Sequence, residues 1–471
     1  MKQFRLLRNL SSKSSAVSSA VSSAISSRAV SLFANNRTTT DSSSSSSTTQ
    51  QLLHQGDAVH QKPCQLKSYS SFSDQPGTEK RVASVTVDPG LRSCHVTWED
   101  GFISQFHSAW LRHNCHSEES RHPNGQKLLK PSSVSCSLVI NSAVVKDTSL
   151  VVTWSGPNGS HTGHIPTDFL RSHNYNRQTL LDRRVQVKPE PASEIPKVSY
   201  DDILNKEGCL YRWIRHINEE GICIIENVPP REDMVEKVAE MIGPVMPTIY
   251  GSTFDVEKTP DEINVAYSSL PIGLHQDLVY FESPPGLQLL HCMEFDECVE
   301  GGHSIFLDVF DMADKFRVMY PDLFQTLTQV PATFQKVHYD RNLPVHLVNQ
   351  KPHIKLNHLG EVCAVYWAPP FEGPLAVDAN DVEKYYLAYE TFAKLLEKGK
   401  LLRYHLRPGD LVVFNNLRML HGRDGFKTNG GARRLRGCYL NIDIFKSQVQ
   451  VLHNLEGDGR LAKRVGNQCW F

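Results

Sequence analysis

Apolar and polar residues alternate along 94–98 (Cys-His-Val-Thr-Trp) and recur in a similar run at 150–154 (Leu-Val-Val-Thr-Trp), a pattern typical of strands with one buried face. Each run ends in Trp and is followed by an aromatic-Leu-Arg unit, at 110–112 and at 169–171. Two copies of one pattern indicate an internal repeat. They predict a small β-rich N-terminal domain at residues 81–187, with a core that contains Trp98, Trp110 and Trp154.

The rest of the chain combines many short apolar runs with a few helical patterns. Apolar residues recur with helical spacing at 201–218, 231–242, 312–327 and 380–398. Strand-like runs lie at 221–225, 287–293, 304–307, 353–356, 362–367, 402–406, 411–415 and 434–445. Many strands with few helices favour a β-sandwich or jelly roll over a parallel α/β sheet. We therefore predict a mainly β fold with flanking helices, with a linker at 188–196 and a jelly-roll domain at 198–460.

The first forty residues are basic and rich in Ser, and no acidic residue precedes Asp41. This composition is typical of a mitochondrial transit peptide, whereas a secretory signal would have a longer apolar run. The Ser run at 42–47 is low-complexity sequence. We predict that residues 1–80 are a transit peptide and a disordered Ser-rich segment, and that the protein is mitochondrial, in the matrix. The alternative is a plain disordered tail on a cytoplasmic protein.

The overall charge excludes several classes of partner. Lys and Arg number 50 and Asp and Glu 51, so nothing indicates binding to nucleic acid or to an anionic membrane. No apolar run approaches the roughly 18 residues of a membrane span. The 11 Cys include no Cys-x-x-Cys pair, which disfavours both a disulfide framework and a thiolate zinc knuckle. We expect reduced thiols.

The candidate chemistry centres on His275-x-Asp277. In an extended segment side chains two apart point to the same face, so this imidazole and carboxylate could hold one cation. They are two thirds of a facial triad, the ligand set of non-heme Fe(II) oxygenases. About one such pair is expected by chance in a chain of this length, and His338-x-Asp340 is a rival. A turn, a buried strand and a second turn at 407–422 lead to His421, a candidate third ligand.

Several stretches together resemble the γ-butyrobetaine and trimethyllysine dioxygenase family, which uses Fe(II) and 2-oxoglutarate. The stretches are Asn-Val-Ala-Tyr at 264–267, His-Gln-Asp at 275–277, Pro-Pro-Gly-Leu-Gln-Leu-Leu-His-Cys at 284–292, Gly-Gly-His-Ser at 301–304 and Leu-His-Gly-Arg at 420–423. The resemblance implies a double-stranded β-helix, that is, a jelly roll. It also implies that His275, Asp277 and His421 bind the iron and are catalytic, and that His338-x-Asp340 is the chance pair. A homodimer is expected on the same grounds.

The resemblance also implies a site for 2-oxoglutarate, with O2 as the second cosubstrate and ascorbate as reductant. It points to Arg433 as the clamp for the distal carboxylate, which a planar guanidinium binds through both oxygens. Ser304 is expected beside the cosubstrate. Alternation along the strand places Tyr439 on the inward face with Arg433, and leaves Arg434 and Arg436 as surface charge.

The resemblance implies a small-molecule substrate that carries a trimethylammonium group, which aromatic faces hold best. Positions of the aromatic cage fall on Tyr250, Phe254, Tyr267 and Tyr439, while a fifth is Leu278 in this chain. Asn264 is expected on the carboxylate side of the substrate. The Trp-Ala-Pro-Pro-Phe segment at 367–371 departs from the family pattern. Of four zinc-ligand positions in a relative's N-terminal domain, Cys115 and His161 match but Ser117 and Ser120 do not, so we predict no zinc.

The predicted function is hydroxylation of a trimethylammonium substrate, with γ-butyrobetaine converted to L-carnitine. The Asn and Tyr of 264–267 favour this substrate, whereas Tyr280-Phe281 resembles trimethyllysine dioxygenase, the alternative. A non-catalytic jelly-roll binding protein would have no need to keep both the three ligands and the arginine. A protein hydroxylase would have no evident use for an aromatic cage.

Overall fold

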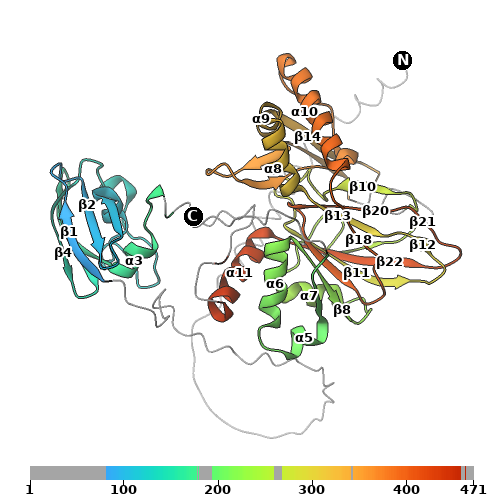
Figure 1. Ribbon diagram of the computed structural model, residues 1–471, viewed down its shortest axis with the longest axis horizontal. Coiled ribbons are helices and arrows are strands. Elements are labelled where there is room, and N and C mark those ends of the chain that lie inside the picture. Colours follow the sequence, from blue (N-terminus) through green and yellow to red (C-terminus); the bar gives the residue numbers. More distant parts are fainter. Residues whose placement is uncertain are drawn as a thin grey trace, which may run out of the picture. The chain divides into compact units, whose positions relative to one another are not determined.

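The computed structural model describes residues 81–177, 179, 194–258, 268–340, 343–457 and 462 (Figure 1). The predicted transit segment and two predicted site residues, Asn264 and Tyr267, lie outside this part of the chain. Within it, no helix has the length and apolarity needed to cross a membrane.

The internal repeat appears as two copies of one unit, each with three antiparallel strands followed by a short helix. The first copy comprises β1 (Val82–Val87), β2 (Ser93–Trp98), β3 (Ile103–His107) and α2 (Ser108–His113). The second comprises β4 (Val139–Lys146), β5 (Ser149–Gly156), β6 (Gly159–Pro166) and α3 (Thr167–Ser172), with a 3-10 turn at Pro131–Ser133 between the copies. The repeat predicted from the alternation is therefore confirmed.

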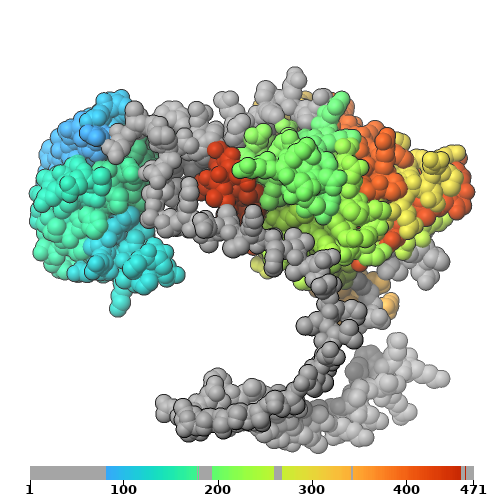
Figure 2. Space-filling model, turned by 90° about the horizontal axis from the view of Figure 1, so that it is seen from below, coloured from blue at the N-terminus to red at the C-terminus, as the bar shows by residue number. Residues whose placement is uncertain are grey.

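The two copies share one apolar core, which contains residues from 82 to 170 and none from the later strands. Trp98 and Trp154 are fully buried within it, as predicted, and the Trp98 indole donates to Ser104 Oγ at 3.0 Å. Trp110 is half-buried and stacks on Phe106. Figure 2 shows these residues, coloured blue to blue-green, packed into one rounded body.

The later strands form the two facing sheets of a jelly roll, which confirms the predicted fold class. A six-stranded sheet has the order β7-β8-β19-β11-β22-β9 and a four-stranded sheet the order β10-β20-β13-β18. The first contains β7 (Lys197–Ser199), β8 (Ile222–Glu226), β19 (Leu411–Asn415), β11 (Leu287–Phe295), β22 (Arg433–Leu440) and β9 (Thr253–Val256). The second contains β10 (Ile272–His275), β20 (Met419–Arg423), β13 (Ser304–Asp308) and β18 (Leu402–Tyr404).

The six-stranded sheet is buried on both faces, which explains its nearly continuous apolar runs. Along β19, Leu411 and Val413 join the core beneath the helices, while Val412 and Phe414 join the core that faces the other sheet. Figure 1 shows α6 (Cys209–Glu220), α7 (Met234–Glu240) and α11 (Ile442–Glu456) over the outer face. The shorter α5 (Tyr200–Asn205) precedes them.

A further layer is built on the four-stranded sheet's side from three helices and two hairpins. The helices are α8 (Val309–Met319), α9 (Pro321–Gln329) and α10 (Ala379–Glu397). The hairpins are β14 (Pro331–His338) with β15 (Val345–Pro352) and β16 (Ile354–Leu356) with β17 (Val362–Val365). Short elements elsewhere are β12 (Glu300–Gly301), β21 (Phe426–Lys427) and a 3-10 turn at Pro369–Phe371.

Three of the predicted elements were wrong in detail, and one hairpin was missed. The helix expected at 312–327 is two helices because Pro321 cannot continue the first one. The helix expected at 201–218 is broken by Gly208, which adopts a left-handed φ of 75°. The strand expected to reach residue 445 ends at Leu440, since Asn441 caps the following helix. The β14–β15 hairpin was not predicted at all.

A buried ion pair joins three of these layers. Arg418 donates through Nε (3.0 Å) and Nη2 (2.7 Å) to Asp308 Oδ2, and through Nη1 to the carbonyl of Glu219 at 3.0 Å. Asp308 also caps α8 through the backbone N–H of Phe310. The pair therefore ties the β19–β20 turn to the end of β13 and to the end of α6.

Removing one partner of this pair should destabilise the protein strongly. Arg418→Ala leaves the Asp308 carboxylate buried without its cation, and we expect the free energy of unfolding to fall by about 3–5 kcal/mol. Urea unfolding followed by far-UV circular dichroism measures the change. The matched control is Lys394→Ala, which removes the exposed Lys394–Glu390 pair and should leave the midpoint unchanged. Equal midpoints for the two variants would contradict the interpretation.

Candidate active site

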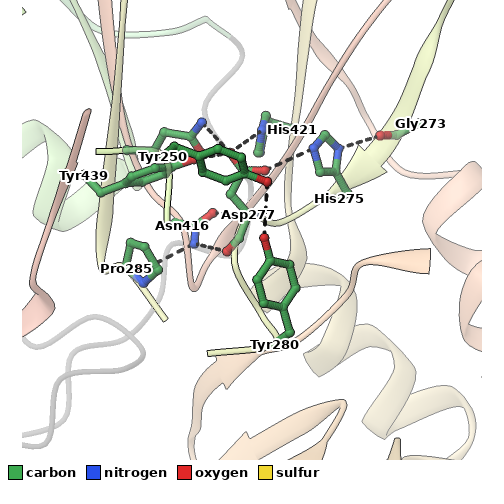
Figure 3. A network of polar contacts seen from close by, with 10 residues as sticks. Tyr250, Gly273, His275, Asp277, Tyr280, Pro285, Asn416, His421 and Tyr439 are labelled. Atoms are coloured by element: carbon green, nitrogen blue, oxygen red, sulfur yellow. Dashed lines mark hydrogen bonds and ion pairs between the residues drawn. The ribbon is translucent and has the colours of Figure 1, made fainter. Parts of the chain in front are cut away.

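Strand pairing brings the three candidate metal ligands together between the two sheets. His275 ends β10 and His421 lies in β20, and the two are direct register partners. Asp277 follows two residues later, with its Oδ1 3.4 Å from His275 Nε2 and its Oδ2 4.0 Å from His421 Nε2. One ligand atom from each residue lies within 4.8 Å of the others, and no other such group of three occurs among the described residues (Figure 3).

The imidazole and carboxylate are held in forms that can bind a cation. His275 Nδ1 lies 2.9 Å from the carbonyl of Gly273, to which it donates, so Nε2 is the ring nitrogen that faces Asp277. Burial lowers the pKa of His421 to about 3, and the nearby His275 acts in the same direction. Burial alone would raise the pKa of Asp277, but the contacts of its carboxylate with His275, His421 and Tyr439 hold that pKa below its usual value. The carboxylate is therefore ionised and His421 neutral.

One oxygen of Asp277 is fully engaged by the protein. Gln288 Nε2 donates to Oδ2 at 2.8 Å, and the Tyr439 hydroxyl donates to the same oxygen at 2.7 Å. The other oxygen, Oδ1, faces His275. A cation bound here would meet a carboxylate whose orientation is fixed by two hydrogen bonds.

Two buried amide side chains fix the backbone around Asp277. Asn416 Oδ1 accepts from the Asp277 N–H at 3.0 Å, and its Nδ2 donates to the Asp277 carbonyl at 3.0 Å (Figure 3). Gln276 pairs with the backbone of Trp367 in a similar way, since its N–H donates to Trp367 O and its Oε1 accepts from Trp367 N, both at 2.9 Å. Sequence reasoning missed both residues, although a polar side chain within an apolar buried stretch is a signal that could have drawn attention to them.

A buried cation lies in the same pocket as the three ligands. Arg433, the first residue of β22, is 5% exposed, and burial lowers its pKa to about 10. Its Nη2 donates to the carbonyl of Gly302 at 3.3 Å, whereas its Nε has no hydrogen-bond partner. No carboxylate among the described residues forms an ion pair with it. A buried guanidinium without an acidic partner is costly, and it indicates a site for an anionic ligand.

Ser304 and Arg423 complete this side of the pocket. Both line it, and they are register partners across β13 and β20. The Arg423 guanidinium donates to the carbonyls of Ser268 at 2.6 Å and Leu270 at 2.8 Å, so it anchors the segment that leads into β10. Arg423 was not predicted, although it lies two residues after His421 in one strand and thus on the same face.

Aromatic side chains also line the pocket. Tyr250, Phe254 and Tyr439 line it as predicted, and Phe254 stacks on Tyr439 with the ring centroids 5.0 Å apart. Leu278 lines it as well. Two further rings, Tyr280 and Phe371, were not predicted as cage residues. The predicted partners Asn264 and Tyr267 lie outside the described residues.

The alternative His338-x-Asp340 pair and the two arginines predicted to face outward, Arg434 and Arg436, do not line this pocket. His338 ends β14 and Asp340 is exposed in the connection to β15, so neither lines the pocket. Arg434 and Arg436 face away from Arg433, as alternation predicted, but they are paired rather than simply solvated. Arg434 lies 2.7 Å from Glu232, and Arg436 lies 2.6 Å from Asp255.

The four positions compared with a zinc site do cluster in the N-terminal domain. Cys115 Sγ lies 3.4 Å from Ser117 Oγ and 3.6 Å from His161 Nε2, and Ser117 Oγ lies 3.0 Å from Ser120 Oγ. Only the thiol and the imidazole are ordinary zinc ligands, and a closed tetrahedral site needs four. The lack of zinc therefore stays a prediction.

Comparisons with known proteins agree with this geometry. Residues 185–439, more than half of the chain, match the family described as taurine catabolism dioxygenase TauD, TfdA family. Residues 86–173 match the N-terminal region described as γ-butyrobetaine hydroxylase-like.

Three relatives show what the chain is similar to. A γ-butyrobetaine dioxygenase of Pseudomonas sp. (strain AK-1) is 29% identical over 76% of this chain and 93% of its own length. Dioxygenase str8 of Strobilurus tenacellus is 30% identical over 73% of this chain and 84% of its own. A mitochondrial trimethyllysine dioxygenase of Mus musculus is 27% identical over 77% of this chain and 88% of its own. The chain thus belongs to the TauD/TfdA dioxygenase family, within the part of it that resembles the γ-butyrobetaine and trimethyllysine enzymes.

Proposed function

We propose that this protein hydroxylates γ-butyrobetaine to L-carnitine, with Fe(II) as cofactor and 2-oxoglutarate and O2 as cosubstrates. The observation that carries the proposal is a single pocket that combines three features. It is lined by the three candidate metal ligands, by a buried arginine with no acidic partner among the described residues, and by several aromatic rings. Membership of a dioxygenase family supports the reaction class, and the relatives' names support a trimethylammonium substrate.

The residues present fit an Fe(II) ion. His275, Asp277 and His421 offer two neutral imidazole nitrogens and one carboxylate oxygen, a donor set that leaves positions for other ligands. With 2-oxoglutarate and O2 bound, iron supplies the oxidising power to hydroxylate an unactivated C–H bond, and succinate and CO2 are released. The protein's own contribution is to orient the ligands, and Gln288 and Tyr439 do this for the carboxylate.

Arg433 is proposed to bind the distal carboxylate of 2-oxoglutarate, with Ser304 beside it. The buried guanidinium lacks an acidic partner among the described residues, and a dicarboxylate would supply one. Ascorbate is proposed as the reductant that keeps the iron in its ferrous state.

The aromatic wall is proposed to hold the substrate's quaternary ammonium group. That group has no N–H to donate, so ring faces are its best partners in a site from which water is excluded. Tyr250, Phe254 and Tyr439 line the pocket, and the resemblance adds Tyr267 and places Asn264 on the carboxylate side. Trimethyllysine is the second candidate, supported by Tyr280-Phe281 and by the mouse relative.

The protein is proposed to work in the mitochondrial matrix. The basic, acid-free start of the chain and the mitochondrial relative support this location. Imaging of a tagged chain with and without residues 1–50 tests it, since loss of the segment should move the protein to the cytosol without loss of activity.

Turnover assays test the proposed function directly. Purified anaerobically, then supplied with Fe(II), 2-oxoglutarate and O2, the protein should release one succinate for each γ-butyrobetaine hydroxylated. We expect kcat/KM for γ-butyrobetaine to exceed that for trimethyllysine by about tenfold or more, the scale of one well-placed pocket contact. Preference for trimethyllysine would reverse the choice of substrate. If no betaine led to succinate release, the proposal that the protein hydroxylates a betaine would be refuted.

Loss of any one ligand should abolish both iron retention and turnover. We expect this of His275→Ala, Asp277→Ala and His421→Ala, because two remaining ligands hold Fe(II) too weakly. His338→Ala is the matched control and should retain wild-type iron content and succinate release. Iron content after desalting is measured together with activity. Iron loss from His338→Ala and not from His275→Ala would show that the wrong pair was chosen.

A further inference from the structure

Tyr280 and Phe371 extend the aromatic wall beyond the residues predicted from the sequence. The Tyr280 hydroxyl lies 3.4 Å from that of Tyr250, and Figure 3 shows the two hydroxyls facing each other beside Asp277. The Phe371 ring stands edge-on to Tyr280, with centroids 5.2 Å apart at 66°. Tyr280 thus lies between the other two rings, and its position decides the shape of this part of the pocket.

Tyr280 is placed by a tight turn that starts at the metal-binding motif. Leu278 has a φ of 58°, a left-handed conformation that is strained for a non-glycine residue. The N–H of Phe281 closes the turn on the carbonyl of Leu278 at 2.9 Å. A strained turn of this kind persists only when its surroundings hold it in place.

Lys351 of β15 holds the far end of that turn. Its Nζ donates to the carbonyl of Phe281 at 2.6 Å and lies 3.4 Å from the carbonyl of Glu282. The ammonium also lies 4.7 Å from the centre of the Tyr366 ring. The side chain is 9% exposed, and no carboxylate among the described residues forms an ion pair with it.

A lysine in such a place is costly for the fold. Burial lowers its pKa to about 8, and the charge of Lys355 adds to this shift while Glu282 opposes it. An apolar side chain of the same length would avoid the desolvation of an ammonium group. The cost is understandable if the two carbonyls that Lys351 binds must stay in place.

We propose that Lys351 is a positioning residue for substrate binding, which fixes Tyr280 through the Phe281 and Glu282 carbonyls so that Tyr250, Tyr280 and Phe371 together enclose the ammonium group. The inference rests on the proposed function and names residues of the same pocket. It makes Tyr280 and Phe371 specificity-determining, and gives the segment at 367–371, which departs from the family pattern, a role in the site.

The test compares Lys351→Met with Lys355→Met, an exposed lysine on the neighbouring hairpin. Enzyme loaded anaerobically with Fe(II) and 2-oxoglutarate is titrated with γ-butyrobetaine by calorimetry, and kcat and both KM values are measured in air. In Lys351→Met the Tyr280 ring should lose its fixed position. The Kd and KM for γ-butyrobetaine should then rise by about tenfold, because one aromatic face no longer holds the ammonium group. The kcat, the KM for 2-oxoglutarate and the iron content should stay within about twofold, and Lys355→Met should resemble the wild type. Lys351→Arg, which keeps the donors, should recover most of the affinity.

A double-mutant cycle separates positioning from a structural role. Tyr280→Leu alone should weaken binding by a similar factor, and the variant with both changes should be no weaker than Tyr280→Leu, because Lys351 acts through that ring. Additive losses, or a lower Tm with unchanged Kd in Lys351→Met, would overturn the inference. If the wild type binds and turns over no betaine, the proposed function fails and the inference with it. Normal wild-type turnover with unchanged Kd in Lys351→Met would overturn the inference alone.

Discussion

The site depends on how the chain is held just after β10 ends. Asp277 lies beyond the last paired residue of that strand, so no strand in the described part of the chain pairs with its backbone. The side-chain amide of Asn416 takes that place, since it accepts from the N–H of Asp277 and donates to its carbonyl. Asn416 is itself fully buried in the turn between β19 and β20, and β20 carries His421. The carboxylate and the distant imidazole are therefore fixed by the same turn.

The register of the large sheet completes this arrangement. Gln288 of β11 and Tyr439 of β22 are direct cross-strand partners, and both donate to the same oxygen of Asp277. The sheet is buried on both faces, so a slip of one residue in either strand would turn that strand's donor and its apolar side chains to the opposite face. Packing of the core and orientation of the carboxylate thus require the same register.

The sequence was informative where the signal was local. The repeat and the mainly β class follow from residues close together in the chain, whereas the choice of His275-x-Asp277 over His338-x-Asp340 and the role of His421 came from the family resemblance. The contacts of Asn416, Gln288 and Lys351 could not be predicted, because each joins side chain and partner from different elements. The β14–β15 hairpin was missed because several of its apolar residues, among them Val337 and Val348, face solvent and obscure the alternation.

Tyr439 has two tasks that cannot be changed separately. Its ring stacks on Phe254 in the wall of the pocket, while its hydroxyl donates to the carboxylate of the metal motif. Most exchanges at Tyr439 would therefore alter both the shape of the pocket wall and the orientation of the carboxylate. A change of substrate preference at this position thus comes with a change at the metal centre.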